Sequence, residues 1–104
     1  MNEKIYTINE IKNIAAPIAA MYDVDKMFLF GSYAQGSANK NSDIDFVIDK
    51  GRLRGLKFAS MLGDLQDNFG KNIDLLTISG LNFDNNDFGF KNRIEKDFIL
   101  LYEH

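Results

Sequence analysis

Two aspartates, Asp43 and Asp45, begin an otherwise apolar stretch that runs to Ile48. Side chains alternate across a β-strand, so both carboxylates would point to one face, about 7 Å apart along the backbone. The apolar side chains of Ile44, Phe46 and Ile48 would point to the opposite face. Like charges on one face repel, and burying them is costly unless something neutralises them. The stretch therefore predicts a strand with an apolar core face and a charged face suited to a divalent cation.

Asp74 is a lone acid within the apolar run Ile73 to Leu76. If this strand neighbours the first one, the carboxylates of Asp43, Asp45 and Asp74 converge. Mg²⁺ prefers carboxylates together with phosphate oxygens and water. Two ions about 4 Å apart can hold the attacking and leaving oxygens of a displacement at phosphorus. Each acid taken alone is more simply read as a turn cap or a solvated strand face, but three acids that all weaken a sheet favour a site.

The apolar run Met27 to Phe30 ends abruptly at Gly31-Ser32. A strand that turns at Gly-Ser into a helical start presents free backbone N–H groups and a hydroxyl, which suit phosphate oxygens. Gly36 would let the following loop pass close to a ligand. A Gly-Ser pair after a strand is usually only a turn, so this interpretation depends on the nearby acids.

The remaining pattern predicts a single α/β (α+β) domain over residues 1–104, with a small mixed sheet of about four strands flanked by helices. Thr7 and Glu10 form a capping box for a first helix that reaches Tyr22, and Pro17 should kink or shorten it. A second long helix should end at Gly70. The expected elements are helix 7–22, strand 27–30, a possible helical turn after Ser32, strand 43–48, helix 53–69, strand 73–77, a surface loop over 79–89, a short helix in 90–96 and strand 98–102.

Composition excludes several kinds of function. The net charge of −3 argues against broad, direct nucleic-acid binding. The chain has no cysteine, which excludes thiol catalysis and thiolate metal sites. Its only histidine is the last residue, His104, so a Ser/His/Asp mechanism is not expected. No apolar run approaches the roughly 18 residues of a membrane span, and we expect a cytoplasmic protein without membrane contact.

Two segments, 29–36 and 42–48, resemble the signature of the minimal nucleotidyltransferase (MNT) family of the DNA polymerase β-like superfamily. That signature is hydrophobic-Gly-Ser-x-Ala-Arg-Gly, a short loop, and Ser-Asp-hydrophobic-Asp. The segment around Asp74 is similar to the family's third-acid strand, and residues 94–102 resemble its usual ending. The resemblance covers nearly the whole chain and implies a nucleotidyltransferase-like fold.

The resemblance also implies roles for individual residues. Four would bind the nucleotide: Gly31, Ser32, Gly36 and Ser42. Three would be catalytic and hold Mg²⁺, with two ions expected: Asp43, Asp45 and Asp74. Asp74 would in addition help to activate the acceptor hydroxyl. The chain departs from the family at Gln35, where a neutral amide replaces an arginine that could contact phosphate or brace the loop.

By the same resemblance, the reaction is transfer of AMP from ATP to a hydroxyl, such as a tyrosine of a helical HEPN ribonuclease toxin. Little chain remains beyond the catalytic core to form an acceptor pocket, which favours a partner protein as acceptor. One alternative is an antitoxin of weak or no activity that neutralises the toxin by binding alone, which Gln35 would suit. Another is a stand-alone transferase for a small molecule, in which a homo-oligomer supplies the missing surface. The side chains of Phe83, Phe88 and Phe90 would serve that interface or belong to the core.

Overall fold

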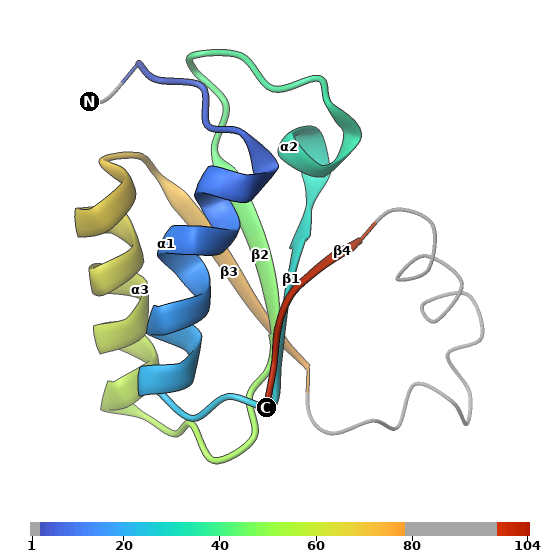
Figure 1. Cartoon of the computed structure of the whole chain (residues 1–104). Helices are drawn as coiled ribbons and strands as arrows, with labels where there is room; N and C mark the ends of the chain where they lie inside the picture. Colours follow the sequence, from blue (N-terminus) through green and yellow to red (C-terminus); the bar gives the residue numbers. More distant parts are fainter. Residues whose placement is uncertain (1–2, 79–97) are drawn as a thin grey trace.

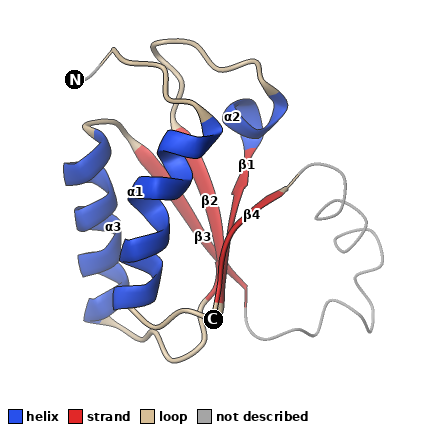
Figure 2. Cartoon of the chain, in the orientation of Figure 1, coloured by secondary structure: helices blue, strands red, loops and turns tan. Residues whose placement is uncertain are grey.

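The computed structural model describes residues 3–78 and 98–104. In chain order its elements are α1 (Ile8–Met21), β1 (Lys26–Phe30), α2 (Gly31–Gln35), β2 (Ile44–Asp49), α3 (Leu56–Phe69), β3 (Ile73–Ile78) and β4 (Ile99–Glu103). The strands form one sheet in the order β3-β2-β1-β4. Figures 1 and 2 show α1 and α3 side by side over one face of this sheet. The predicted small mixed sheet flanked by helices is confirmed.

The strand directions follow from the connections. β1 is antiparallel to both of its neighbours, β2 and β4. β2 and β3 are parallel. The helix α3 connects them and returns the chain to the end of the sheet at which β2 began. This β2-α3-β3 unit is what places the third acid-bearing strand beside the first.

Alternate residues of the central strand form the core face. Ile44, Phe46 and Ile48 are completely buried beneath the helices. The parallel register sets Ile73 and Leu75 of β3 beside the first two of them, and both are buried as well. Residues at the intervening positions of β2 and β3 therefore point to the face that the helices do not cover.

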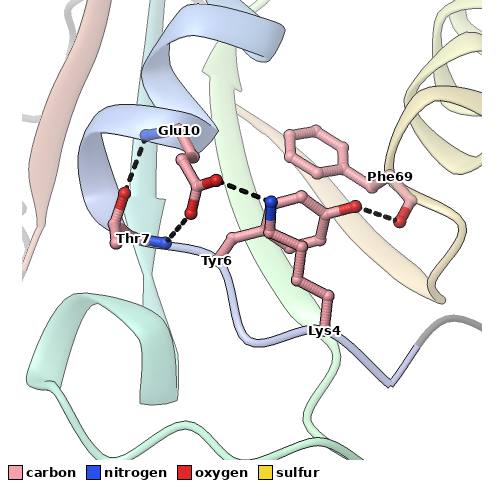
Figure 3. A network of polar contacts seen from close by, with 5 residues as sticks. All are labelled: Lys4, Tyr6, Thr7, Glu10 and Phe69. Atoms are coloured by element: carbon pink, nitrogen blue, oxygen red, sulfur yellow. Dashed lines mark hydrogen bonds and ion pairs between the residues drawn. The ribbon is translucent and has the colours of Figure 1, made fainter.

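Helix α1 begins as predicted. The Thr7 hydroxyl accepts a hydrogen bond from the Glu10 N–H at 3.1 Å, and the Thr7 N–H donates to Glu10 Oε1 at 2.9 Å (Figure 3). The expected shortening at Pro17 is wrong, because α1 continues to Met21 with Pro17 inside it. Pro17 and Asn13 are exposed, so the Asn13 carbonyl that loses its helical donor can be hydrated.

The N-terminal segment is tied to the end of α3 through Tyr6. Its hydroxyl donates to the Phe69 carbonyl at 2.7 Å, and the two rings meet edge to face at 5.2 Å (Figure 3). Gly70 ends α3 in the left-handed conformation, as predicted. These contacts fix the turn from which β3 starts.

Some boundaries differ from the predicted ones. α3 begins at Leu56, because Leu53 instead turns into the core ahead of the helix and is 2% exposed. β2 begins at Ile44, so Asp43 lies one residue before the strand. The helical turn expected after Ser32 is α2. The predicted loop over 79–89 and the predicted helix in 90–96, which together contain Phe83, Phe88 and Phe90, lie outside the described residues. Within the described ranges, no helix is long and apolar enough to cross a membrane.

Candidate active site

The carboxylates of Asp45 and Asp74 come from neighbouring strands at the same level of the sheet. The parallel register makes these two residues direct partners across β2 and β3. Both alternate with buried core residues, so both point to the face away from α1 and α3. Asp45 is half-buried and Asp74 is exposed. Asp74 therefore shares a sheet face with Asp45, as the sequence interpretation required, whereas Asp43 precedes the strand.

Asp43 adds a third charge to this pair. It is exposed, in the last loop position before β2. The pKa of Asp45 is raised, first by burial and then by the negative charges of Asp74 and Asp43. The three carboxylates therefore interact electrostatically as one group, centred on the half-buried Asp45.

The donor chemistry of this group suits a hard divalent cation, which prefers oxygen ligands. A cation would also offset the repulsion from Asp74 and Asp43, which adds to burial in raising the pKa of Asp45. Within residues 3–78 and 98–104, however, no three acidic or histidine side chains stand close enough together to form a ready-made metal cluster. Since Asp43 and Asp74 are exposed, side-chain rotation about a fixed backbone is what would gather the three groups around an ion.

Gly31 lies against the Asp45 carboxylate. The antiparallel register sets Phe30, the last residue of β1, opposite Asp45, and Gly31 follows directly as the first residue of α2. Gly31 has φ +73°, and a Cβ there would collide with Asp45 Oδ2 and lie 3.0 Å from Asp45 Cγ. Only glycine fits both the backbone conformation and the space. Ser32 follows Gly31 and is half-buried in the first turn of α2.

The other residues predicted to bind the nucleotide also have roles in the local backbone structure. Gly36 ends α2 in the left-handed conformation at φ +77°, and a Cβ there would meet no atom within 4 Å. The Ser42 hydroxyl accepts a hydrogen bond from the Asn39 N–H at 2.9 Å and closes a turn just before Asp43. Gln35 is exposed at the end of α2. Binding of a nucleotide by these residues stays a prediction.

Sequence reasoning missed Lys71. A lysine after a helix-ending glycine is normally a solvated residue, yet Lys71 is only 5% exposed. Its ammonium donates to the Lys40 carbonyl at 3.0 Å, across 31 residues of chain. Lys71 and Asp43 both line a polar pocket of about 400 Å³ at this edge of the sheet. No local sequence pattern indicates such a contact.

Fold and site geometry agree with the similarity to known proteins. A family model described as a nucleotidyltransferase domain matches residues 9–101, and the chain belongs to this family. A protein of Methanocaldococcus jannaschii, provisionally named protein adenylyltransferase MJ0435, is 33% identical over 75 residues. The match covers 71% of this chain and 81% of the archaeal protein. The predicted membership of a nucleotidyltransferase family is confirmed, and the protein is a nucleotidyltransferase.

Solved structures share the fold at low sequence identity. A toxin–antitoxin crystallised with AMP-PNP superposes with a TM-score of 0.67 at 19% identity, over 89% of this chain and 73% of that one. The toxin–antitoxin MntA-HepT superposes with a TM-score of 0.58 at 14% identity, over 89% and 70% of the two chains. At such identities the likeness establishes the architecture.

Proposed function

We propose that this nucleotidyltransferase is a magnesium-dependent adenylyltransferase that transfers AMP from ATP to a tyrosine hydroxyl of a HEPN-type toxin, and so acts as an antitoxin. The observation that carries the proposal is the pairing of Asp45 with Asp74 on one sheet face, with Gly31 packed against Asp45. The name of the archaeal relative supports protein adenylylation. Likeness to a toxin–antitoxin crystallised with AMP-PNP, an ATP analogue, supports both the nucleotide and the partner.

Asp43, Asp45 and Asp74 are the residues that would hold Mg²⁺, with two ions expected. Bound there, the metal neutralises charge on the phosphate oxygens during transfer. Gly31 brings the start of α2 beside Asp45, so that the Ser32 hydroxyl and nearby N–H groups can donate to phosphate oxygens. Gly36 and Ser42 would bind the nucleotide from the loop between α2 and β2.

The acceptor hydroxyl would attack the α-phosphorus of ATP, forming the new P–O bond as the bond to the bridging oxygen of pyrophosphate breaks. Asp74 is suited to receive the hydroxyl proton, because it is exposed at the strand position beside the half-buried Asp45. Asp43 and Asp74 are both exposed, so the side chain of a partner protein could approach them, which suits a macromolecular acceptor.

The test uses ATP labelled on the α-phosphate, Mg²⁺, this chain and the product of the gene adjacent to its own. We expect label on the partner, and loss of that label when the partner's acceptor tyrosine is changed to phenylalanine. Asp45→Asn should lower the transfer rate at least 100-fold, since it removes the central carboxylate. Asp67→Asn is the matched control, because Asp67 is exposed on α3, which covers the opposite face of the sheet from Asp45 and Asp74. Equal labelling by the wild type and Asp45→Asn would refute the mechanism.

A second candidate function rests on Gln35, which is exposed at the end of α2 where a cation would be useful for phosphate binding. In that case the chain would neutralise a toxin by contact and would not turn over ATP. Calorimetry with ATP and Mg²⁺ separates the two, because a contact-only antitoxin would show no nucleotide binding while still inhibiting the toxin.

A further inference from the structure

Lys71 is one of two charged side chains that are buried among the described residues, the other being Asp49. An ammonium group taken out of water is unfavourable unless it is hydrogen-bonded. Its contact with the Lys40 carbonyl at 3.0 Å is therefore the feature to explain. That carbonyl belongs to the loop between α2 and β2, and Lys71 belongs to the turn between α3 and β3. The bond joins the two chain segments that enter the acid-bearing strands.

The loop around Lys40 is a tight polar turn. The Ser42 N–H donates to the Asn39 carbonyl at 3.0 Å, and the Asn41 N–H donates to Asn39 Oδ1 at 2.8 Å. Most of its residues are exposed, so the turn is rigid within itself but gains little from packing. Its placement relative to the sheet must come from longer-range contacts, and the Lys71 hydrogen bond is one of them.

Two hydrogen bonds to the α3–β3 turn fix the backbone on either side of Asp43. On its N-terminal side, Lys71 binds the carbonyl of Lys40, three residues earlier. On its C-terminal side, the Ile44 N–H donates to the Asn72 carbonyl at 3.1 Å. Lys71 and Asn72 are also the residues from which the strand carrying Asp74 begins. The α3–β3 turn thus links the backbone position of Asp43 to that of Asp74.

We propose that Lys71 is a positioning residue that sets the Asp43 carboxylate for shared cation binding with Asp45 and Asp74, by holding the Lys40 carbonyl. This inference rests on the proposed function, in which the three carboxylates hold the metal. Lys71 is 5% exposed as a residue and its ammonium donates to the Lys40 carbonyl, so its effect on Asp43 would pass through the loop backbone. Removal of a residue that orients a metal ligand typically lowers metal affinity about 10- to 100-fold.

The experiment measures Mn²⁺ binding by water-proton relaxation, without nucleotide, and the Mg²⁺ dependence of adenylyl transfer. Lys71→Met removes the donor but keeps an unbranched apolar stem, and Lys71→Arg keeps an N–H donor. Lys57→Met is the control, because Lys57 is an exposed lysine at the other end of α3. We expect at least tenfold weaker Mn²⁺ binding by Lys71→Met, binding close to wild type by Lys71→Arg and Lys57→Met, and recovery of kcat in Lys71→Met at saturating Mg²⁺.

Two results would overturn the inference while leaving the proposed function intact. One is a folded Lys71→Met that binds Mn²⁺ as the wild type does. The other is a loss of kcat in Lys71→Met that high Mg²⁺ does not restore. If Lys71→Met does not fold, Lys71→Leu, which also lacks a donor, takes its place with the same criteria. A wild-type chain that binds no Mn²⁺ at all would instead refute the metal site of the proposed function, and this inference with it.

Discussion

The Asp45 carboxylate occupies the space that any side chain at Gly31 would need. These residues lie on different elements, Gly31 opening α2 and Asp45 within β2, and the β1–β2 register brings them together. Glycine is consequently required at position 31 for two reasons, its positive φ and the adjacent acid. The turn at Gly31 and the Asp45 carboxylate are in direct contact, so substitutions at the two positions should be energetically coupled.

Gly31→Ala should lower the free energy of unfolding by about 1–3 kcal/mol, because it adds a collision to an unfavourable backbone conformation. Urea denaturation measures this change. In a double-mutant cycle, Asp45→Ala should remove the part of the cost that comes from the collision, giving a coupling of at least about 0.5 kcal/mol. Gly36→Ala, at a similar φ but with open space around its Cβ position, is the control for backbone strain alone. An equal cost of Gly31→Ala in both backgrounds would contradict the steric explanation.

Asp45 should make stability depend on pH in a defined direction. Burial, Asp74 and Asp43 raise the pKa of Asp45 in the folded protein. The folded chain therefore binds the proton more tightly than the unfolded chain, whose aspartates titrate near a pKa of about 4. Stability due to this group falls as the pH rises from about 4 through the raised pKa, and at neutral pH the ionised carboxylate is destabilising.

Asp45→Asn should accordingly raise the Tm at pH 7, and the difference from wild type should shrink as the pH approaches 4. Thermal melts across this range, without divalent cations, measure it. Addition of Mg²⁺ with ATP should stabilise the wild type and leave Asp45→Asn unchanged, because only the wild type keeps the central ligand. Asp67→Asn should show neither effect. A lower Tm for Asp45→Asn at pH 7 would mean that this carboxylate is stabilised by a neighbour.

Gln35→Arg should increase adenylyl transfer several-fold if a cation at the end of α2 helps to hold phosphate. Gln35 is exposed, so the replacement needs no repacking. Its effect should decrease with added salt, because an exposed charge acts through screened electrostatics. Steady-state kinetics at low and high ionic strength measure it, with Gln35→Met as the matched uncharged variant. A rate that is the same for arginine and methionine would show that the position does not act through charge.

The Asp49 side chain should lower the free energy of unfolding. It is 1% exposed at the end of β2, and among the described residues neither of its carboxylate oxygens has a hydrogen-bond partner. Asp49→Val, which suits a strand and carries no polar group, should raise the free energy of unfolding by about 1–3 kcal/mol. Asp49→Asn should give a smaller gain, because an amide still needs partners. Denaturation of the three proteins measures this order, and a net loss with valine would reveal a role for the carboxylate that the contacts do not show.

Local patterns in the chain were sufficient to predict the described helices and strands, and the strand that carries Asp45. The alternation around Asp43 and Asp45 predicts a strand with one charged face, and β2 has that face. The Thr7–Glu10 capping box and Gly70 predict the ends of two helices, and both are as predicted. These features depend on neighbours within a few residues, which a sequence displays directly. Pro17 shows the limit of such rules, since its solvent exposure allows the helix to continue.

The convergence of the site was decided by tertiary structure. The sequence contains the acid Asp74, but only the packing of α3 over the sheet sets β3 parallel to β2 in the register that pairs Asp74 with Asp45. A shift of one residue would send Asp74 to the opposite face. The contact of Gly31 with Asp45 and that of Lys71 with Lys40 likewise join segments whose proximity no local pattern encodes. The physical reason is that register and chain crossing depend on the whole core, whereas strand alternation and helix capping depend only on adjacent residues.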